Sequence, residues 1–231
     1  DDHPMKSMLS KAAWLRVIPF VLFMVMLAIR GNWPAGAQAV LDAKWVYGLG
    51  VLLVGGALYV LWPQYQELAR DQRKLGWLGW LLSITVGVVV FVLWINLTEP
   101  WMIIGTPTAS FQPVDDEGQL MWSLVLIRWV GAALMVPVME ELFWRSFLMR
   151  WIDNPDFEAV SPKAVTVKAI ALSTFAFTLA HTLWLGAIVA GLAYAWLYKR
   201  TGSLWAPVVA HGVTNGVLGI WVVLWGNWAF W

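Results

Sequence analysis

Seven apolar stretches, most of them long enough to cross a lipid bilayer, follow one another along this chain of 231 residues. A membrane-spanning helix needs about 20 residues that are mostly apolar. The stretches cover residues 12–29, 44–62, 75–97, 120–151, 164–183, 185–198 and 204–225. Because hydrocarbon offers no partner to unpaired backbone groups, such stretches must be helical. We therefore predict an all-α, polytopic transmembrane bundle of about seven to eight spans.

Composition agrees with this fold class and excludes several functions. The chain is 60% hydrophobic and 13% charged, whereas soluble domains are about half apolar and a quarter charged. Its net charge of +1 gives no indication of a nucleic-acid partner. It has no cysteine, which excludes disulfides, thiol catalysis and thiolate metal sites.

The distribution of lysine and arginine predicts how the chain is oriented. Positive residues favour cytoplasmic loops, and with seven spans most of them fall on the side of the N-terminus. We therefore expect an integral membrane protein with a cytoplasmic N-terminus and an extracytoplasmic C-terminus. An alternative interpretation makes segment 12–29 a signal peptide, because the small residues at 35–39 are similar to a cleavage site.

The connection between the third and fourth segments divides the chain in two. Residues 98–119 contain prolines, glycines and the acidic run Asp115-Asp116-Glu117. We expect residues 1–119 to form N-terminal transmembrane helices and an extracytoplasmic loop. Residues 120–231 should form the transmembrane core that carries the chemistry, with the first three segments walling its cavity.

Two adjacent carboxylates, Glu140 and Glu141, lie inside the fourth apolar segment. Ionisable groups at membrane depth are costly and are usually kept for a function. Adjacent helical residues point about 100° apart, so the two side chains cannot face one point. Glu141 can pair with Arg145 one turn later, either to support a site or as a purely structural network. Glu140 is left unpartnered and is the candidate base, and Pro137 is expected to bend the helix just before it.

Three further polar side chains lie in later segments. His181 follows Phe177 by one helical turn, and His211 precedes Asn215 by one turn. Each pair alone is weak, since a single histidine on an apolar face is more often a packing residue than a catalyst. Counted from the helix ends at 1.5 Å per residue, however, these residues and Glu141 fall in one band roughly 10–20 Å from the cytoplasmic surface. Their common depth predicts one site on three core helices.

In this order, the three pairs resemble the CPBP intramembrane proteases, which include CaaX prenyl endopeptidases and bacterial Abi proteins. The motifs are Glu140-Glu141-Leu-Phe-Trp-Arg145, Phe177 to His181, and His211 to Asn215. The resemblance covers about residues 120–225, and its wider context is similar to a bacterial branch associated with exosortase systems. It implies a bacterial inner-membrane location and a CPBP-like catalytic core in residues 120–231.

The resemblance also implies an endopeptidase that acts on a membrane-associated protein or peptide within the lipid bilayer. Glu140 would activate a water molecule with the help of His181. His211 and Asn215 would form the oxyanion hole. The supporting residues would be Glu141, Arg145 and Phe177.

A zinc ion and two other functions are alternatives. Glu140, His181 and His211 could supply three zinc ligands and leave one position for water. The sequence shows no His-Glu-x-x-His motif and no acidic partner for the second nitrogen of either imidazole, so we favour a site without a cofactor. The other functions are a non-catalytic membrane scaffold or maturation partner of the same fold, and a proton-coupled transporter. A transporter predicts internal repeats, which we do not find.

Overall fold

A computed structural model describes residues 9–34, 41–70, 75–105 and 111–231. Within these ranges the regular secondary structure is helical, apart from one isolated antiparallel bridge. The helices are α1 (Lys11–Gly31), α2 (Ala43–Leu61), α3 (Gln66–Ala69), α4 (Trp77–Asn96), α5 (Trp122–Val130), α6 (Val136–Glu141), α7 (Met149–Asp153), α8 (Val167–Leu179), α9 (Trp184–Thr201) and α10 (Trp205–Trp225). The predicted all-α fold is confirmed.

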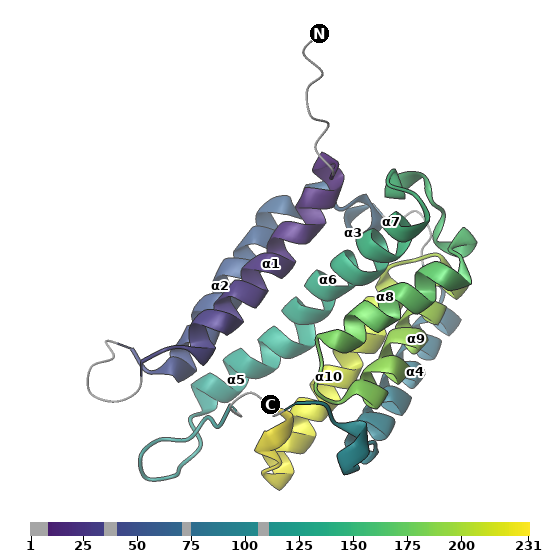
Figure 1. The fold of residues 1–231 in the computed structure, drawn as a ribbon. Helices are drawn as coiled ribbons and strands as arrows, with labels where there is room; N and C mark the ends of the chain where they lie inside the picture. Colours follow the sequence, from purple (N-terminus) through teal and green to yellow (C-terminus); the bar gives the residue numbers. More distant parts are fainter. Residues whose placement is uncertain (1–8, 35–40, 71–74, 106–110) are drawn as a thin grey trace.

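The bundle has two groups of helices on either side of one long central helix (Figure 1). Helices α5, α6 and α7 run end to end and form this central helix. Helices α1 and α2 lie on one side of it, and α4, α8, α9 and α10 lie on the other. The central helix therefore contacts both groups and can combine side chains from each.

Five segments within the described ranges are long and apolar enough to cross a membrane: Lys11–Gly31, Ala43–Gln64, Trp77–Asn96, Trp122–Asp153 and Trp205–Trp225. The other two of the seven predicted segments differ from a full span. Helix α8 has 13 residues, or about 20 Å, against a hydrocarbon thickness of about 30 Å. Helix α9 carries Lys199 and Arg200 in its last turn. These helices form an integral membrane protein in which α8 and α9 make a short hairpin.

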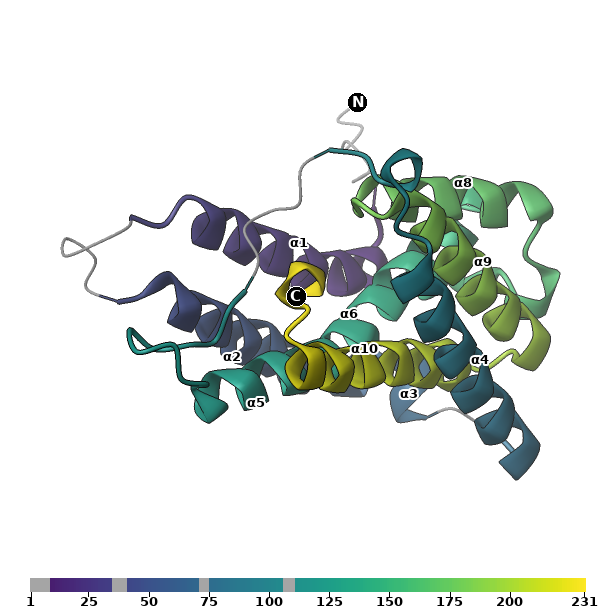
Figure 2. The same ribbon diagram turned by 90° about the horizontal axis from the view of Figure 1, so that it is seen from below.

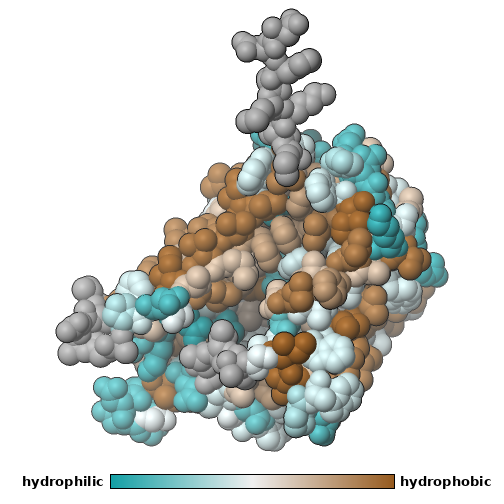
Figure 3. Space-filling view, in the orientation of Figure 1, coloured by the Kyte–Doolittle hydropathy of each residue, from teal (hydrophilic) through white to brown (hydrophobic). Residues whose placement is uncertain are grey.

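The outer surface is apolar over most of its height. Leu52, Tyr59, Leu78 and Leu134 are among the large apolar side chains exposed by more than half. Hydrophobic residues form a broad band in Figure 3, and the hydrophilic ones gather toward the two ends of the bundle. Such a surface would be an aggregation liability in water, but in a bilayer it faces lipid.

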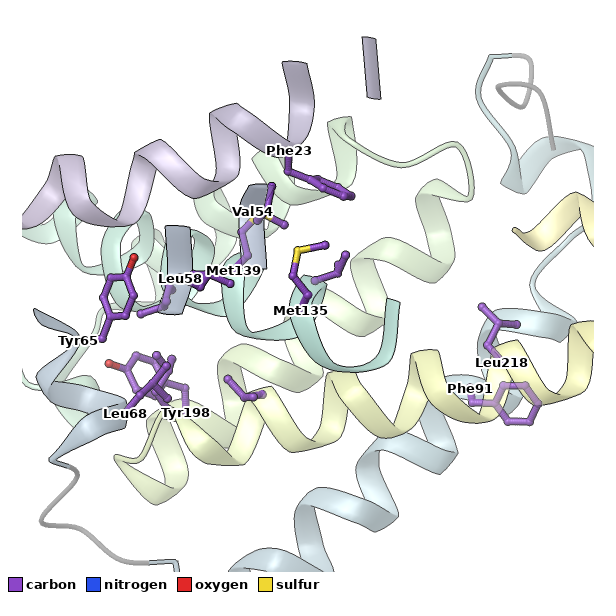
Figure 4. Packing of buried hydrophobic residues seen from close by; sticks show 14 of the residues in the cluster. Phe23, Val54, Leu58, Tyr65, Leu68, Phe91, Met135, Met139, Tyr198 and Leu218 are labelled. Carbon is purple, nitrogen blue, oxygen red and sulfur yellow. The ribbon is translucent and has the colours of Figure 1, made fainter. Parts of the chain in front are cut away.

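The main core joins the N-terminal helices to the central helix. Phe23 of α1 and Val54 of α2 pack with Met135 and Met139 of the central helix (Figure 4). All four side chains are buried. Because lipid tails are as apolar as these side chains, packing rather than the hydrophobic effect holds such helices together.

A polar clamp fixes the same helices at the end of the bundle nearest the N-terminus. Arg16 of α1 is 1% exposed, and its guanidinium donates to both carboxylate oxygens of Glu67 at 2.7 and 2.8 Å. The hydroxyl of Ser146, on the central helix, donates to the same carboxylate. The clamp therefore restricts how the central helix can rotate against α1 and α3.

The central helix departs from α-helical geometry on both sides of the two glutamates. Residues Gly131–Met135 and Leu142–Leu148 form π-helical turns, which often occur at functional sites. The first of these turns lies just before Pro137, where the sequence predicted that the helix is disturbed. Proline has no N–H to donate to the carbonyl of Ala133. A Cβ atom at Gly212 would lie only 2.8 Å from that carbonyl oxygen. Glycine at this position therefore lets α10 approach the widened turn.

Candidate active site

One cavity of about 180 Å³ brings the predicted residues together. Its lining includes Glu140 from α6, His181 from just beyond α8, and His211 and Asn215 from α10. Phe177 also lines it, whereas the buried Glu141 and Arg145 are not part of the lining. Three of the four side chains that the sequence placed at a common depth, His181, His211 and Asn215, therefore meet Glu140 around one space.

Glu140 is the unpaired carboxylate of the site. Its Oε2 atom is buried and has no hydrogen-bond partner among the described residues. Nε2 of His211 lies 4.0 Å from it, beyond direct hydrogen-bond distance. A buried polar atom of this kind requires an explanation, and here the cavity in front of it has room for a water molecule or a substrate group.

Glu141 connects the central helix to α10. Its Oε1 accepts hydrogen bonds from Nη1 of Arg145 at 3.0 Å and from Nδ1 of His211 at 2.8 Å. The predicted pair with Arg145 is present, but the expectation that neither imidazole has an acidic partner is wrong. That contact joins residues 70 positions apart, so local helical spacing could not reveal it. In this bond Nδ1 of His211 keeps its proton and donates it to Glu141, which leaves Nε2 on the side of Glu140.

His181 is held by backbone and aromatic contacts. Its Nδ1 donates to the carbonyl oxygen of Phe177 at 2.8 Å. The imidazole packs against the Phe177 ring, with centroids 4.4 Å apart, and edge-on against Trp94 at 5.8 Å. With its proton on Nδ1, the neutral ring has Nε2 as an acceptor.

Asn215 has one structural hydrogen bond that the sequence did not indicate. Its Nδ2 donates to the carbonyl oxygen of Ala132 at 2.9 Å, and Ala132 lies within the first π-helical turn. A carboxamide nitrogen has two protons, so this bond orients the amide and uses one of them. The second remains for a group in the cavity.

Two further residues contact the site without any motif that marked them. The Tyr194 ring stacks on His211 with centroids 5.0 Å apart, and its hydroxyl donates to Thr214 at 2.7 Å. Thr214 in turn donates to the carbonyl of Gly87 at 2.8 Å. Arg145 lies over the ring of Tyr194 at 5.4 Å. A single tyrosine in an apolar helix carries no sequence signal for this role.

The residues predicted as zinc ligands do not converge as a metal site. Across the described parts of the chain, no group of three or more His, Asp or Glu side chains is placed to hold a metal ion. The anchored Nδ1 atoms of His181 and His211 do resemble those of zinc-bound histidines, so the sequence-based argument against zinc fails. The preference for a site without a cofactor stays a prediction, and we derive no step through a metal.

The fold and this cavity define an integral membrane protein with acid–base groups placed inside a helical bundle. Residues 122–217 match the family described as type II CAAX prenyl endopeptidase Rce1-like, which supports the predicted similarity to the CPBP/CaaX proteases. The matched segment is less than half of the chain and contains all four predicted catalytic residues. No curated protein and no solved structure shows a significant match to the chain. The predicted resemblance is confirmed at the level of the family; the exosortase-associated branch stays a prediction.

Proposed function

We propose that the protein is an intramembrane endopeptidase that hydrolyses a peptide bond of a membrane-associated protein or peptide. The family supports an endopeptidase activity in general. The observation that carries the proposal for this site is the buried, unpaired Oε2 of Glu140 on a cavity that His181, His211 and Asn215 also line. A carboxylate in such a place can take a proton from water.

The reaction begins with a water molecule between Glu140 and the substrate carbonyl. Glu140 accepts one proton of the water while the oxygen forms a bond to the carbonyl carbon, and Nε2 of His181 accepts a hydrogen bond that orients the water. The C–N bond of the tetrahedral intermediate then breaks. The proton held by Glu140 passes to the leaving amine, which balances the hydrolysis.

The oxyanion that forms in this intermediate needs hydrogen-bond donors. Asn215 supplies its second amide proton. His211 can donate from Nε2 only when both ring nitrogens carry protons, because Nδ1–H is already given to Glu141. The Glu141 carboxylate balances the charge of that imidazolium. Donors placed where negative charge develops are worth most in a site with little water.

The same proposal includes the location and orientation of the chain. We place it in a bacterial inner membrane with a cytoplasmic N-terminus, because lysine and arginine gather on that side of the predicted spans. Alkaline phosphatase fusions after residue 34 or residue 231 should be active, and fusions after residue 70 inactive. The opposite pattern contradicts the orientation and leaves the chemistry untouched.

Substitution of the base tests the enzymatic function. Membrane fractions from cells with the wild type, Glu140→Gln or Glu99→Gln are compared by quantitative proteomics. Glu99 is exposed outside the cavity, so it is a matched control. We expect an unprocessed substrate to accumulate only with Glu140→Gln. If Glu140→Gln folds and processing continues, the protease function is refuted and a scaffold is favoured.

A further inference from the structure

Tyr194 of α9 borders the cavity but takes no part in the proposed reaction. Its side chain is 1% exposed and lines the same cavity as Glu140 and His211. None of the three predicted motifs includes it. Helices α4, α9 and α10 contact one another beside this cavity (Figure 2). A side chain at this junction is placed to link groups from all three helices.

His211 is attached to the central helix through one atom of its ring. Its Nδ1 donates to Oε1 of Glu141 at 2.8 Å, while Nε2 lies 4.0 Å from Oε2 of Glu140, beyond hydrogen-bond distance. The imidazole is also joined to the backbone through Cβ. These two attachments leave the ring free to tilt about the line between them. Because the oxyanion would meet Nε2, its position depends on what fixes the plane of the ring.

The ring of Tyr194 supplies this third constraint. Its centroid lies 5.0 Å from that of the His211 imidazole, and the two planes are 19° apart. Aromatic rings favour offset, nearly parallel arrangements of this kind. In a close-packed interior, a tilt of the imidazole would drive its edge into the face of the tyrosine. The stack therefore sets the direction in which Nε2 points.

The tyrosine is itself held by a chain of hydrogen bonds. Its hydroxyl donates to Oγ1 of Thr214 at 2.7 Å, and Thr214 donates to the carbonyl oxygen of Gly87 at 2.8 Å. On α10, Thr214 lies three residues after His211 and directly before Asn215. The chain therefore joins α9, α10 and α4 beside both proposed oxyanion donors.

The surroundings of the Tyr194 ring also suit a charged imidazole. The guanidinium of Arg145 lies 5.4 Å from the ring centroid, and Arg145 and His211 both donate to Oε1 of Glu141. The face of an aromatic ring is negative and attracts cations. When His211 carries two ring protons, as the proposed oxyanion donor does, the stack attracts its charge. The Glu141 carboxylate offsets the repulsion between the two cations.

We propose that Tyr194 is a positioning residue whose ring fixes the plane of the His211 imidazole and directs Nε2 into the cavity. This inference rests on the proposed function, because it gives a role to a further residue of the same site. Tyr194 acts through His211 and not on the reacting atoms. An oxyanion donor works in the transition state rather than on the bound substrate. Loss of the tyrosine ring should therefore lower kcat and leave KM nearly unchanged.

Nuclear magnetic resonance tests the stack without a substrate. The chain has three histidines, so isotopically labelled histidine gives three imidazole signals, which substitution of each histidine by glutamine assigns. The Tyr194 ring should shift the carbon-bound ring protons of His211 upfield. Tyr194→Phe keeps the ring and should keep this shift, whereas Tyr194→Leu should lose it.

Tyr198 offers a matched control one turn later on the same helix. It is also 1% exposed and is not part of the lining of this cavity. Tyr198→Leu removes a buried aromatic ring of the same size and should leave the His211 signal in place. If Tyr194→Leu does not fold, Tyr194→Met, whose side chain fills more of the space, replaces it. Nuclear Overhauser contacts between the Tyr194 and His211 rings in the wild type test the stack without any variant at position 194.

Kinetics test the consequence for the reaction. The substrate is the protein that accumulates with Glu140→Gln, and its cleavage is followed with purified enzyme in detergent. Tyr194→Leu should lower kcat by about 10- to 100-fold, the cost of a misplaced catalytic group. Tyr194→Phe should lose only about threefold, because it keeps the ring and loses one hydrogen bond. Tyr198→Leu should retain the kcat of the wild type.

Three results overturn the proposal. They are a His211 signal without an upfield shift in the wild type, a shift that survives Tyr194→Leu, and equal kcat for Tyr194→Leu and Tyr198→Leu. A rise in KM as large as the fall in kcat would also contradict it, because the tyrosine would then act on substrate binding.

The failure of this inference is separable from the failure of the proposed function. If Tyr194→Leu loses the shift but cleaves as fast as the wild type, the positioning role is refuted and the protease stands. If Glu140→Gln folds and processing continues while the wild type shows the shift and Tyr194→Leu loses it, the orientation of His211 by Tyr194 stands and the protease is refuted.

Discussion

Glu141 and His211 are joined by a 2.8 Å hydrogen bond between Oε1 and Nδ1, although 70 residues separate them in the chain. The bond ties the central helix to α10 in the middle of the bundle. Arg145 contacts the same oxygen at 3.0 Å. The two adjacent glutamates therefore have different surroundings: Oε1 of Glu141 has two partners, and Glu140 borders the cavity.

This arrangement predicts that Glu141 acts through His211. Glu141→Gln should lower kcat by about 10- to 100-fold, as loss of a carboxylate that orients a histidine does in metal sites, with a smaller change in KM. It should also lower the free energy of unfolding by about 3 kcal/mol, because Arg145 keeps its buried charge without a carboxylate. Steady-state kinetics and thermal unfolding in detergent measure both effects.

The double variant Glu141→Gln/Arg145→Gln separates the two roles. Removing the unpaired charge should restore part of the stability, but kcat should stay low because His211 has still lost its carboxylate. Full kcat in the single variant would show that Glu141 has a structural role only.

Close packing of α4 against α10 predicts a position that accepts only glycine. A Cβ atom at Gly87 would collide with the carbonyl oxygen of Ala210 and would lie 2.8 Å from Cβ of Val213. Gly87→Ala should therefore destabilise the protein by about 2 kcal/mol and reduce activity, because α10 carries His211 and Asn215. Gly55→Ala in α2 meets no atom within 4 Å and should be neutral or stabilise by up to about 1 kcal/mol. Similar unfolding temperatures for the two variants would contradict this account.

The polar clamp predicts a loss of stability in acid. Burial by itself raises the pKa of Glu67, but the hydrogen bonds and charge of Arg16, with the Ser146 hydroxyl, outweigh it and hold that pKa below its usual 4.5. A lowered pKa contributes stability that is complete above the unfolded value and is lost as the pH falls through the folded one. The unfolding temperature of the wild type should therefore fall below about pH 4.5.

Glu67→Gln should be less stable at neutral pH and should show less of this acid dependence. Glu99→Gln changes an exposed carboxylate and should follow the wild type. Parallel curves for the wild type and Glu67→Gln between pH 5 and pH 3 would show that the acid transition has another origin.

Metal removal tests the choice between a glutamate-activated and a zinc-activated water. Because no three ligands converge in the described residues, activity should be unchanged after treatment with 1,10-phenanthroline and dialysis. Loss of activity that Zn²⁺ restores would instead assign a metal to Glu140, His181 and His211. In that case, Glu140→Gln should also lower the zinc content measured by atomic absorption.

Much of the site could be predicted because helical spacing is local. The Glu141–Arg145 pair, the unpaired Glu140 and the contact of Phe177 with His181 each follow from residues one turn apart or adjacent. Their common depth came from counting residues along helices. The weaker predictions concerned helix ends. Helix α8 is seven residues shorter than its predicted apolar segment, and four of the seven lie at its C-terminal end, where the apolar run continues through the turn into α9.

The sequence by itself determined that the chain forms apolar helices, which polar residues lie inside them, and at what depth. Only the tertiary structure decided how those helices rotate about their own axes, and hence which polar atoms touch. The bond from Glu141 to His211, the carbonyl of Ala132 that Asn215 contacts and the stack of Tyr194 on His211 all depend on that rotation. It is set by contacts between distant helices, such as the clamp at Arg16 and the glycine at position 87, which no local periodicity encodes.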